Sequence, residues 1–264
     1  MATVLTVRTV SPLRTVSPWF TSGKNQAQTH LRMFCFPYAG GGAAIYRGWE
    51  SYVPPGVEIL AIQPPGRGNR FREPPFDRLN HLVAATADAM EPFLDLPFVL
   101  FGHSLGAFVS FELAHLLGSQ FGIKVPHLFV SGARAPQLRR NRHNIHDLPE
   151  DEFITELKTL NGTPPEVLEN PELMHMISKT LRADFAVAET YSSSHAEPLH
   201  CPITVFGGLD DTLAAREDLE AWRVHTTSSF DLYQLPGDHF FIHTSHSLIL
   251  RIVSRELTRL IRQD

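Results

Sequence analysis

The pentapeptide Gly102-His-Ser-Leu-Gly106 has the residue pattern of a serine nucleophile carried on a sharp turn. The apolar run Phe98–Phe101 precedes it and a helical pattern follows it, which is the strand, turn and helix context that this pattern requires. Side chains at Gly102 and Gly106 would collide with the neighbouring strand and helix. We therefore expect Ser104 to project its hydroxyl above the edge of a sheet, at a helix N-terminus that favours developing negative charge.

A serine hydroxyl is a weak nucleophile near neutral pH, so a base must take its proton and an acid must orient that base. His239 follows the last apolar run and precedes the C-terminal helical pattern, where the base is expected when the chain order is Ser, Asp, His. The acid candidates are Asp210 and Asp211, and we favour Asp211 because the turn glycine Gly208 stands three positions ahead of it. Residues 129–136, one strand earlier, contain no carboxylate that could serve instead.

Acyl transfer also needs two N–H donors that stabilise the negative oxygen of the tetrahedral intermediate. The backbone N–H of Leu105, directly after the nucleophile, is one expected donor. The loop after the first apolar run reads Phe36-Pro-Tyr-Ala-Gly-Gly-Gly-Ala-Ala44, and we assign the second donor to Ala39, with Tyr38 and Gly40 beside it. A glycine-rich turn can also bind phosphate, but this one lacks the G-x-G-x-x-G and P-loop patterns, so no nucleotide is expected.

The remaining histidines and cysteines do not suggest a cofactor. His239, His243 and His246 have the spacing of a metal cluster, but no cysteine or carboxylate pattern accompanies them. The only cysteines, Cys35 and Cys201, stand in or beside apolar runs and form neither a disulfide framework nor a zinc motif. We therefore predict no metal ion and no cofactor, and a protein of the reducing cytoplasm.

Composition and charge disfavour several other classes of protein. The 264 residues carry a formal net charge of −5, and no long basic run with interleaved aromatics suggests a nucleic-acid groove. No stretch approaches the roughly 18 apolar residues of a membrane-spanning helix, and Arg8 and Arg14 stand where a signal peptide needs an apolar core. We expect a monomer that binds neither nucleic acid nor membrane.

The elements that must position these residues follow from short apolar runs bounded by Gly and Pro. Residues 1–30 are rich in Ser and Thr, carry a direct repeat of Arg-Thr-Val-Ser-Pro, and are expected to form a tail that is poorly ordered in part. Over residues 31–264, strands alternate with helical patterns, which predicts one α/β domain with a mostly parallel sheet covered on both faces. The expected strands are Leu31–Phe36, Val57–Ile62, Phe98–Phe101, His127–Val130, Ile203–Phe206 and Phe230–Leu235. With the serine turn, this order predicts the α/β-hydrolase fold.

A long segment separates the strand that ends near Ser131 from the strand that begins near Ile203. Apolar residues recur there at helical spacing, with a break at residues 161–165. We predict a helical lid over about residues 134–198, inserted after the sixth core strand of the hydrolase fold, with an apolar face that could line an acyl pocket. The apolar series are Phe153, Leu157 and Leu160, then Leu173, Ile177 and Leu181.

With these residues placed, the chain from about Trp19 onward resembles the type II thioesterases, the stand-alone editing enzymes of polyketide synthases and nonribosomal peptide synthetases. The resemblance rests on several separate motifs in the same order. They are Phe36-Pro-Tyr-Ala-Gly-Gly41, Gln63-Pro-Pro-Gly-Arg-Gly-Asn-Arg70, Gly102-His-Ser-Leu-Gly-Ala107, Leu160-Asn-Gly-Thr-Pro-Pro-Glu166, Leu181-Arg-Ala-Asp-Phe185 with Glu189-Thr-Tyr191, and Pro236-Gly-Asp-His-Phe-Phe241. Two features depart from the family pattern: the N-terminal repeat, and Tyr38 where many members carry His.

The resemblance implies a serine thioesterase that hydrolyses acyl or peptidyl thioesters on the phosphopantetheine arm of carrier proteins, and so edits or releases chains in polyketide or nonribosomal peptide biosynthesis. It implies Ser104, Asp211 and His239 as catalytic residues. Two groups of arginines have the charge to receive an acidic carrier protein, and equally the composition of a solvated surface. The groups are Arg67, Arg70 and Arg72, and Arg139, Arg140 and Arg142.

Other functions are compatible with the same residues. An acyltransferase or aminoacyl shuttle would pass the acyl group to another thiol or amine instead of water, and a medium-chain thioesterase would release a product from acyl carrier protein. The lid and loop motifs disfavour a general carboxylesterase. A lapsed hydrolase that serves as a small-molecule receptor is disfavoured by the intact set of Ser104, Asp211 and His239.

Overall fold

One mixed sheet lies at the centre of the structure, a computed structural model that describes residues 17–22, 29–138, 143–193, 195 and 197–263. Its strands are β1 (Phe20–Ser22), β2 (Leu31–Phe36), β3 (Val57–Ile62), β4 (Phe98–His103), β5 (Leu128–Ser131), β6 (Ile203–Gly208) and β7 (Phe230–Leu235). They lie in the order β1-β3-β2-β4-β5-β6-β7. Each neighbouring pair is parallel except β1 with β3, so the mostly parallel sheet predicted from the sequence is confirmed.

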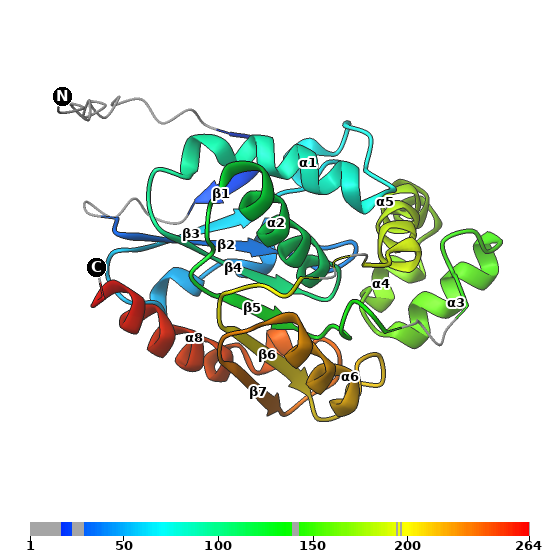
Figure 1. Cartoon of the computed structure of the whole chain (residues 1–264). Helices are drawn as coiled ribbons and strands as arrows, with labels where there is room; N and C mark the ends of the chain where they lie inside the picture. Colours follow the sequence, from blue (N-terminus) through cyan, green and yellow to red (C-terminus); the bar gives the residue numbers. More distant parts are fainter. Residues whose placement is uncertain (1–16, 23–28, 139–142, 194, 196, 264) are drawn as a thin grey trace, which may run out of the picture.

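Helices cover both faces of this sheet (Figure 1). One face carries α1 (Leu79–Met90), α2 (Leu105–Phe121) and α6 (Arg216–Glu220), and the other carries α8 (His246–Ile261). Alternate side chains of β2 enter the two layers, because successive residues of a strand point to opposite faces. Phe34 and Phe36 pack with the α1 and α2 layer, whereas Met33 and Cys35 pack with the α8 layer. The short elements are η1 (Ala43–Tyr46), η2 (Trp49–Ser51), η3 (Gly68–Arg70), η4 (Glu91–Phe93), η5 (Ala221–His225) and α7 (Phe241–Thr244).

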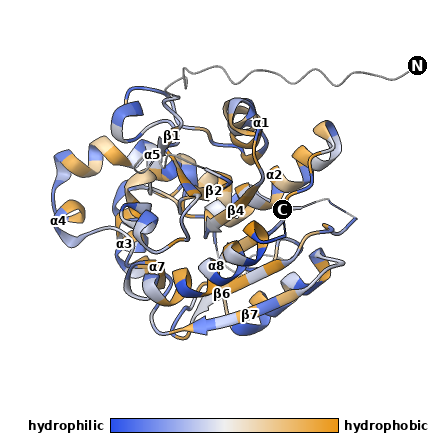
Figure 2. Ribbon diagram, turned by 90° about the vertical axis from the view of Figure 1, so that its left-hand side faces the viewer, coloured by the Kyte–Doolittle hydropathy of each residue, from blue (hydrophilic) through white to orange (hydrophobic). Residues whose placement is uncertain are grey.

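The inner strands are buried on both faces, as their continuous apolar runs predict. Every residue of β2, β3, β4, β5 and β6 is buried, whereas only Leu235 of β7 is. Figure 2 shows the same contrast, with hydrophobic colouring along β6 and mixed colouring along the edge strand β7.

The short strand β1 lies within residues 1–30, where the sequence predicts a tail that is poorly ordered in part. It pairs antiparallel with β3, with Phe20 opposite Ile62, and the ring of Phe20 packs edge-on against Phe34 and Phe93. Three residues are too few to give a periodic signal, so this strand was missed. The rest of the expected tail, residues 1–16 and 23–28, lies outside the described residues.

A helical insertion joins β5 to β6. It contains α3 (Glu150–Leu160), α4 (Pro165–Leu168) and α5 (Pro171–Thr190), and the expected break between helices falls at Asn161, whose φ is 58°. The sequence predicts this insertion after the sixth core strand, in the strand numbering of the hydrolase fold. Among the described strands of this chain the insertion follows β5, the fifth strand. The insertion has a small apolar core of its own, formed by Ile145, Phe153, Leu157, Leu168, Met174 and Leu181.

Candidate active site

Ser104 occupies the turn between β4 and α2, as the pentapeptide predicted. Its backbone has φ 55° and ψ −116°, a strained conformation for a residue with a side chain. A Cβ on Gly102 would lie 2.1 Å from the carbonyl oxygen of Gly106, and a Cβ on Gly106 would lie 2.1 Å from that of Phe36. Only glycine therefore fits at either position, and the close packing of strand and helix holds the serine at the sheet edge.

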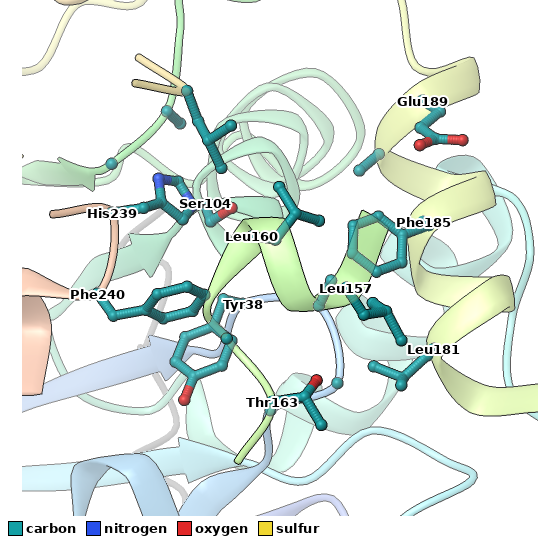
Figure 3. Close-up of a pocket in the computed structure, with 18 of the residues that line it drawn as sticks. Tyr38, Ser104, Leu157, Leu160, Thr163, Leu181, Phe185, Glu189, His239 and Phe240 are labelled. Carbon is teal, nitrogen blue, oxygen red and sulfur yellow. Dashed lines mark hydrogen bonds between the residues drawn. The ribbon is translucent and has the colours of Figure 1, made fainter. Parts of the chain in front are cut away.

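The structure brings the three residues predicted as nucleophile, base and acid into one hydrogen-bonded series. Nε2 of His239 lies 2.9 Å from Oγ of Ser104, and Nδ1 lies 2.9 Å from Oδ2 of Asp211. Because an ionised carboxylate can only accept, Nδ1 of His239 must carry the proton that it donates. In the neutral imidazole, the lone pair of Nε2 then faces the serine hydroxyl. Figure 3 shows Ser104 and His239 side by side at the pocket.

The carboxylate that reaches His239 is that of Asp211 and not that of its neighbour Asp210. The Asp211 side chain is fully buried, and its second oxygen accepts hydrogen bonds from the backbone N–H groups of Leu213 (2.8 Å) and Ala214 (3.3 Å). Asp210 is exposed, and its N–H donates to the carbonyl of Gly237. The turn after β6 therefore points only Asp211 at the histidine.

Ala39 and Leu105, the residues expected to donate N–H groups, flank the serine. Ala39 and Ser104 both line the main cavity, and Leu105 is the first residue of α2. Within the described part of the chain, neither backbone N–H has a hydrogen-bond acceptor. Both groups are thus available to a negative oxygen that forms beside Ser104.

The cavity over the serine has a volume of about 690 Å³. Its floor contains Ser104 and His239, and apolar side chains of the insertion form a wall, among which Figure 3 labels Leu157, Leu160, Leu181 and Phe185. Four residues of the two predicted apolar series line it: Leu157, Leu160, Ile177 and Leu181. The other two do not, because Phe153 is in the core of the insertion and Leu173 faces solvent.

The aromatic rings of Tyr38 and Phe240 form a pair beside His239. The rings of Tyr38 and Phe240 meet edge to face at 5.1 Å, and the Tyr38 hydroxyl lies 2.8 Å from Nε2 of His243. Burial raises the pKa of Tyr38 and lowers the pKa of His243, so both groups are held neutral near pH 7 and the contact is an ordinary hydrogen bond. Tyr38 stands where many members of the family that this chain resembles carry His. In this structure the hydroxyl of Tyr38 has His243 as its polar partner.

His103, next to the nucleophile, is a site residue that the sequence analysis missed. It is fully buried, and its Nδ1 and Nε2 lie 2.8 Å from Oγ of Ser131 and 2.9 Å from the carbonyl oxygen of His239. Burial lowers its pKa well below 6.5, which keeps the ring neutral. The sequence offered no signal for this role, because it depends on residues distant in the chain.

The arginines considered for a carrier protein have different surroundings. Arg67 pairs with Asp184 and Arg70 pairs with Glu73, and both arginine side chains are largely buried, so neither of the two alternatives, contact with a carrier protein or a solvated surface, describes them. Arg72 is exposed. The second group, Arg139, Arg140 and Arg142, lies outside the described residues.

Two further properties concern the described residues as a whole. No three His, Cys, Asp or Glu side chains gather there in an arrangement that could hold a metal ion. None of the helices found there combines the length and the apolar character needed to cross a membrane.

Comparison with known proteins identifies relatives over nearly the whole chain. The family model of the thioesterase domain matches residues 31–257. Linear gramicidin dehydrogenase LgrE of Brevibacillus parabrevis is 44% identical, over 94% of this chain and 94% of its own length. Gramicidin S biosynthesis protein GrsT of Aneurinibacillus migulanus is 41% identical, over 92% of this chain and 94% of its own length. Although LgrE is named a dehydrogenase, the present sequence has no G-x-G-x-x-G dinucleotide motif.

A solved structure shares the fold. The type II thioesterase BorB from the borrelidin biosynthetic cluster superimposes with a TM-score of 0.83 at 33% identity, covering 90% of this chain and 97% of its own. This similarity confirms the α/β-hydrolase fold that the strand order and the serine turn predicted.

Proposed function

We propose that this chain, which belongs to the thioesterase family, hydrolyses acyl or peptidyl thioesters held on the phosphopantetheine arm of carrier proteins. Family membership makes the chain a thioester hydrolase, and the names of its relatives point to gramicidin and borrelidin biosynthesis. We infer that this chain edits or releases chains in a polyketide or nonribosomal peptide pathway. The observation that carries the proposal is the series Ser104, His239, Asp211 at the floor of an apolar cavity.

The first half of the proposed reaction transfers the acyl group to the enzyme. Oγ of Ser104 attacks the thioester carbonyl carbon while its proton passes to Nε2 of His239, and Asp211 stabilises the imidazolium that forms. The N–H groups of Ala39 and Leu105 donate to the negative oxygen of the tetrahedral intermediate. When the carbon–sulfur bond breaks, His239 returns the proton to the departing pantetheine sulfur.

The second half returns the serine to its starting state. His239 takes a proton from a water molecule, which attacks the acyl carbonyl carbon, and the same two N–H groups stabilise the second tetrahedral intermediate. Collapse of that intermediate breaks the bond to Oγ of Ser104, which regains its proton from His239. The products are a carboxylic acid and free enzyme.

The acyl chain would lie in the cavity against the insertion. Leu157 and Leu160 of α3 and Ile177 and Leu181 of α5 offer it an apolar wall, and burying an apolar chain there is favourable by about 25 cal/mol per Å² removed from water. We propose that the segment of about residues 134–198 acts as the lid of the site. That the enzyme works as a monomer remains a prediction.

The test uses acyl carrier proteins loaded with acyl groups of different lengths. Mass spectrometry should show the free carrier thiol and the free acid appearing with wild-type enzyme, and Ser104→Ala should slow this by about 10⁴-fold or more. Oxygen esters of the same acids serve as the comparison. If they are cleaved much faster than the carrier thioesters, or if the acyl group appears on another thiol or amine instead of as free acid, hydrolysis of carrier thioesters is not the function.

A further inference from the structure

Three sequence motifs, one of them the loop that contains Ala39, meet at one buried carboxylate, that of Asp184. This residue lies on α5 in the segment Leu181-Arg-Ala-Asp-Phe185, and its side chain is only 5% exposed. Its Oδ2 accepts a hydrogen bond from Nη1 of Arg67 (2.6 Å), and its Oδ1 accepts one from Nη2 of Arg67 (2.8 Å). Oδ2 also accepts from the backbone N–H of Gly40 (2.6 Å). The carboxylate thus joins the insertion to the glycine loop that contains Ala39.

The glycine loop is held at two consecutive residues. Asp184 binds the N–H of Gly40, and Nη1 of Arg67 donates to the carbonyl of Gly41 (3.0 Å). Gly40 has a φ of +79°, and a Cβ there would lie 2.5 Å from Cδ2 of Leu181, so α5 packs directly on the loop. The loop conformation therefore depends on side chains from two other parts of the chain.

These contacts act on the peptide that carries the proposed donor. The N–H of Gly41 donates to the carbonyl of Tyr38 (2.9 Å), which belongs to the same peptide unit as the N–H of Ala39. That peptide is trans, so its C=O and N–H point in opposite directions. Holding Gly41 therefore fixes the Tyr38 carbonyl on one side and the direction of the Ala39 N–H on the other.

Gln63 completes the arrangement from the segment Gln63-Pro-Pro-Gly-Arg67. Its Oε1 accepts from the N–H of Ala43 (3.0 Å), and its Nε2 donates to the carbonyl of Arg67 (2.9 Å). The Arg67 side chain is 11% exposed and forms two parallel hydrogen bonds with Asp184, a geometry that fixes orientation as well as charge. Removing one partner of such a pair leaves the charge of the other buried and uncompensated, which is costly. Because Asp184 lies on α5 and the pair also binds Gly40 and Gly41, the position of the glycine loop depends on the position of α5.

We propose that Arg67 and Asp184 are positioning residues for acyl transfer. They hold the Gly40–Gly41 loop so that the N–H of Ala39 points at the oxygen of the tetrahedral intermediate, and they make this alignment depend on the seating of α5. The inference rests on the proposed function through the role assigned to Ala39.

The experiment compares Asp184→Asn with Thr180→Val. In Asp184→Asn, the amide keeps the size of the carboxylate but puts an NH₂ group where one oxygen now accepts hydrogen bonds. Thr180→Val removes a different contact between α5 and the 63–70 segment. That contact is the 2.8 Å hydrogen bond from the Thr180 hydroxyl to the carbonyl of Gly66. Each variant is assayed on a p-nitrophenyl ester and an acyl thioester. Binding is measured for two ligands of equal chain length, an alkyl trifluoromethyl ketone and an alkyl thioether without a carbonyl.

The two ligands separate oxyanion stabilisation from simple occupancy. Ser104 adds to the ketone carbon and passes its proton to His239, so the adduct carries a negative oxygen, while the thioether only fills the cavity. Asp184→Asn should lower kcat about 10- to 100-fold with little change in KM and weaken ketone binding by a similar factor. Thioether binding should change less than about 3-fold, and Thr180→Val should leave both ligands near wild type.

The proposal is overturned if Asp184→Asn leaves ketone binding unchanged, or if it weakens ketone and thioether equally. It is also overturned if Thr180→Val matches Asp184→Asn on the ketone, because the effect would then be loose docking of α5. Should Asp184→Asn not fold, Arg67→Lys replaces it, and a loss of ketone binding without loss of thioether binding is again required. Failure of the proposed function would give a different result. The wild-type enzyme would not hydrolyse carrier thioesters, whereas the difference in ketone binding between wild type and Asp184→Asn would still test the role of the loop.

Discussion

Nε2 of His103 lies 2.9 Å from the backbone carbonyl oxygen of His239, so the residue before the nucleophile supports the residue proposed as the base. A carbonyl can only accept, so Nε2 carries the proton, and the unprotonated Nδ1 accepts from the hydroxyl of Ser131 at 2.8 Å. Because burial holds the pKa of His103 well below 6.5, this tautomer persists across the pH range in which the enzyme would work. The serine turn and the histidine loop are therefore joined by a bond that does not titrate near neutrality.

Replacing His103 should impair the reaction without removing any group that touches substrate. His103→Leu leaves the His239 carbonyl buried without a donor, a cost of about 1–3 kcal/mol, and frees the loop to shift. We expect kcat to fall at least about 10-fold with KM within about 3-fold of wild type, because small displacements of a catalytic group are costly. His103→Gln, which retains an N–H donor, should recover part of the loss. An unchanged kcat for His103→Leu would contradict this role.

The two neighbouring aspartates should differ sharply in their importance. Asp211→Asn removes the charge that orients His239 and stabilises its imidazolium, and a comparable change in serine proteases lowers kcat by about 10⁴-fold. We expect a loss of about 10³-fold or more. Asp210→Asn is the matched control, since that side chain is exposed and its backbone N–H, which the substitution keeps, donates to Gly237. Its kcat should stay within about 2-fold of wild type. The reverse pattern in steady-state kinetics would show that Asp210 is the acid.

Sequence patterns were sufficient for features that depend on local chemistry. The serine turn needs glycine at two positions, and continuous apolar runs mark strands that are buried on both faces, so Ser104 and the inner strands could be predicted. The order of strands along the chain then located His239 and Asp211 at the sheet edge. The predictions of Ser104 and of the inner strands use spacing and residue type within a single segment, and those of His239 and Asp211 add only the order of the segments along the chain.

Features that depend on distant partners could not be predicted in the same way. Arg67 looked like part of a basic surface, but its partner Asp184 stands 117 positions later, on a helix of the insertion. The role of His103 depends in the same way on a carbonyl 136 positions away. Periodicity indicates which face of an element is buried, but it does not say which polar side chains meet once the elements pack.

Filling the cavity should change which acyl chains are hydrolysed. Leu160 lines the cavity from the end of α3, and Leu160→Trp would take up space that a long acyl chain needs. We expect kcat/KM for long acyl thioesters to fall by about 10-fold or more relative to short ones. Leu173→Trp is the control, because Leu173 is 39% exposed on α5 and does not line the cavity. If the ratio of long-chain to short-chain kcat/KM does not move in Leu160→Trp, the acyl group lies elsewhere.

One buried histidine, His127, and one half-buried histidine, His115, should make the fold sensitive to acid. Burial lowers the pKa of His127 from 6.5 to about 3 and that of His115 to about 4. A group whose pKa is lower in the folded state favours folding fully above about pH 6.5, and this contribution is lost as the pH falls toward the folded value. For His127 the free energy of unfolding should decrease by at most about 1.4 kcal/mol per pH unit over that range.

The variant His127→Gln isolates this contribution. Glutamine can keep a hydrogen bond to Oγ1 of Thr204, which now lies 2.8 Å from Nε2 of His127, but it does not titrate. Chemical denaturation at pH 7.5, 6 and 5 should therefore show a shallower decline in unfolding free energy for His127→Gln than for wild type, whatever the two stabilities are at pH 7.5. His81→Gln, at an exposed position of α1, should keep the wild-type slope. Parallel slopes for wild type and His127→Gln would mean that His127 does not titrate differently in the folded and unfolded chains, and would contradict the argument from burial.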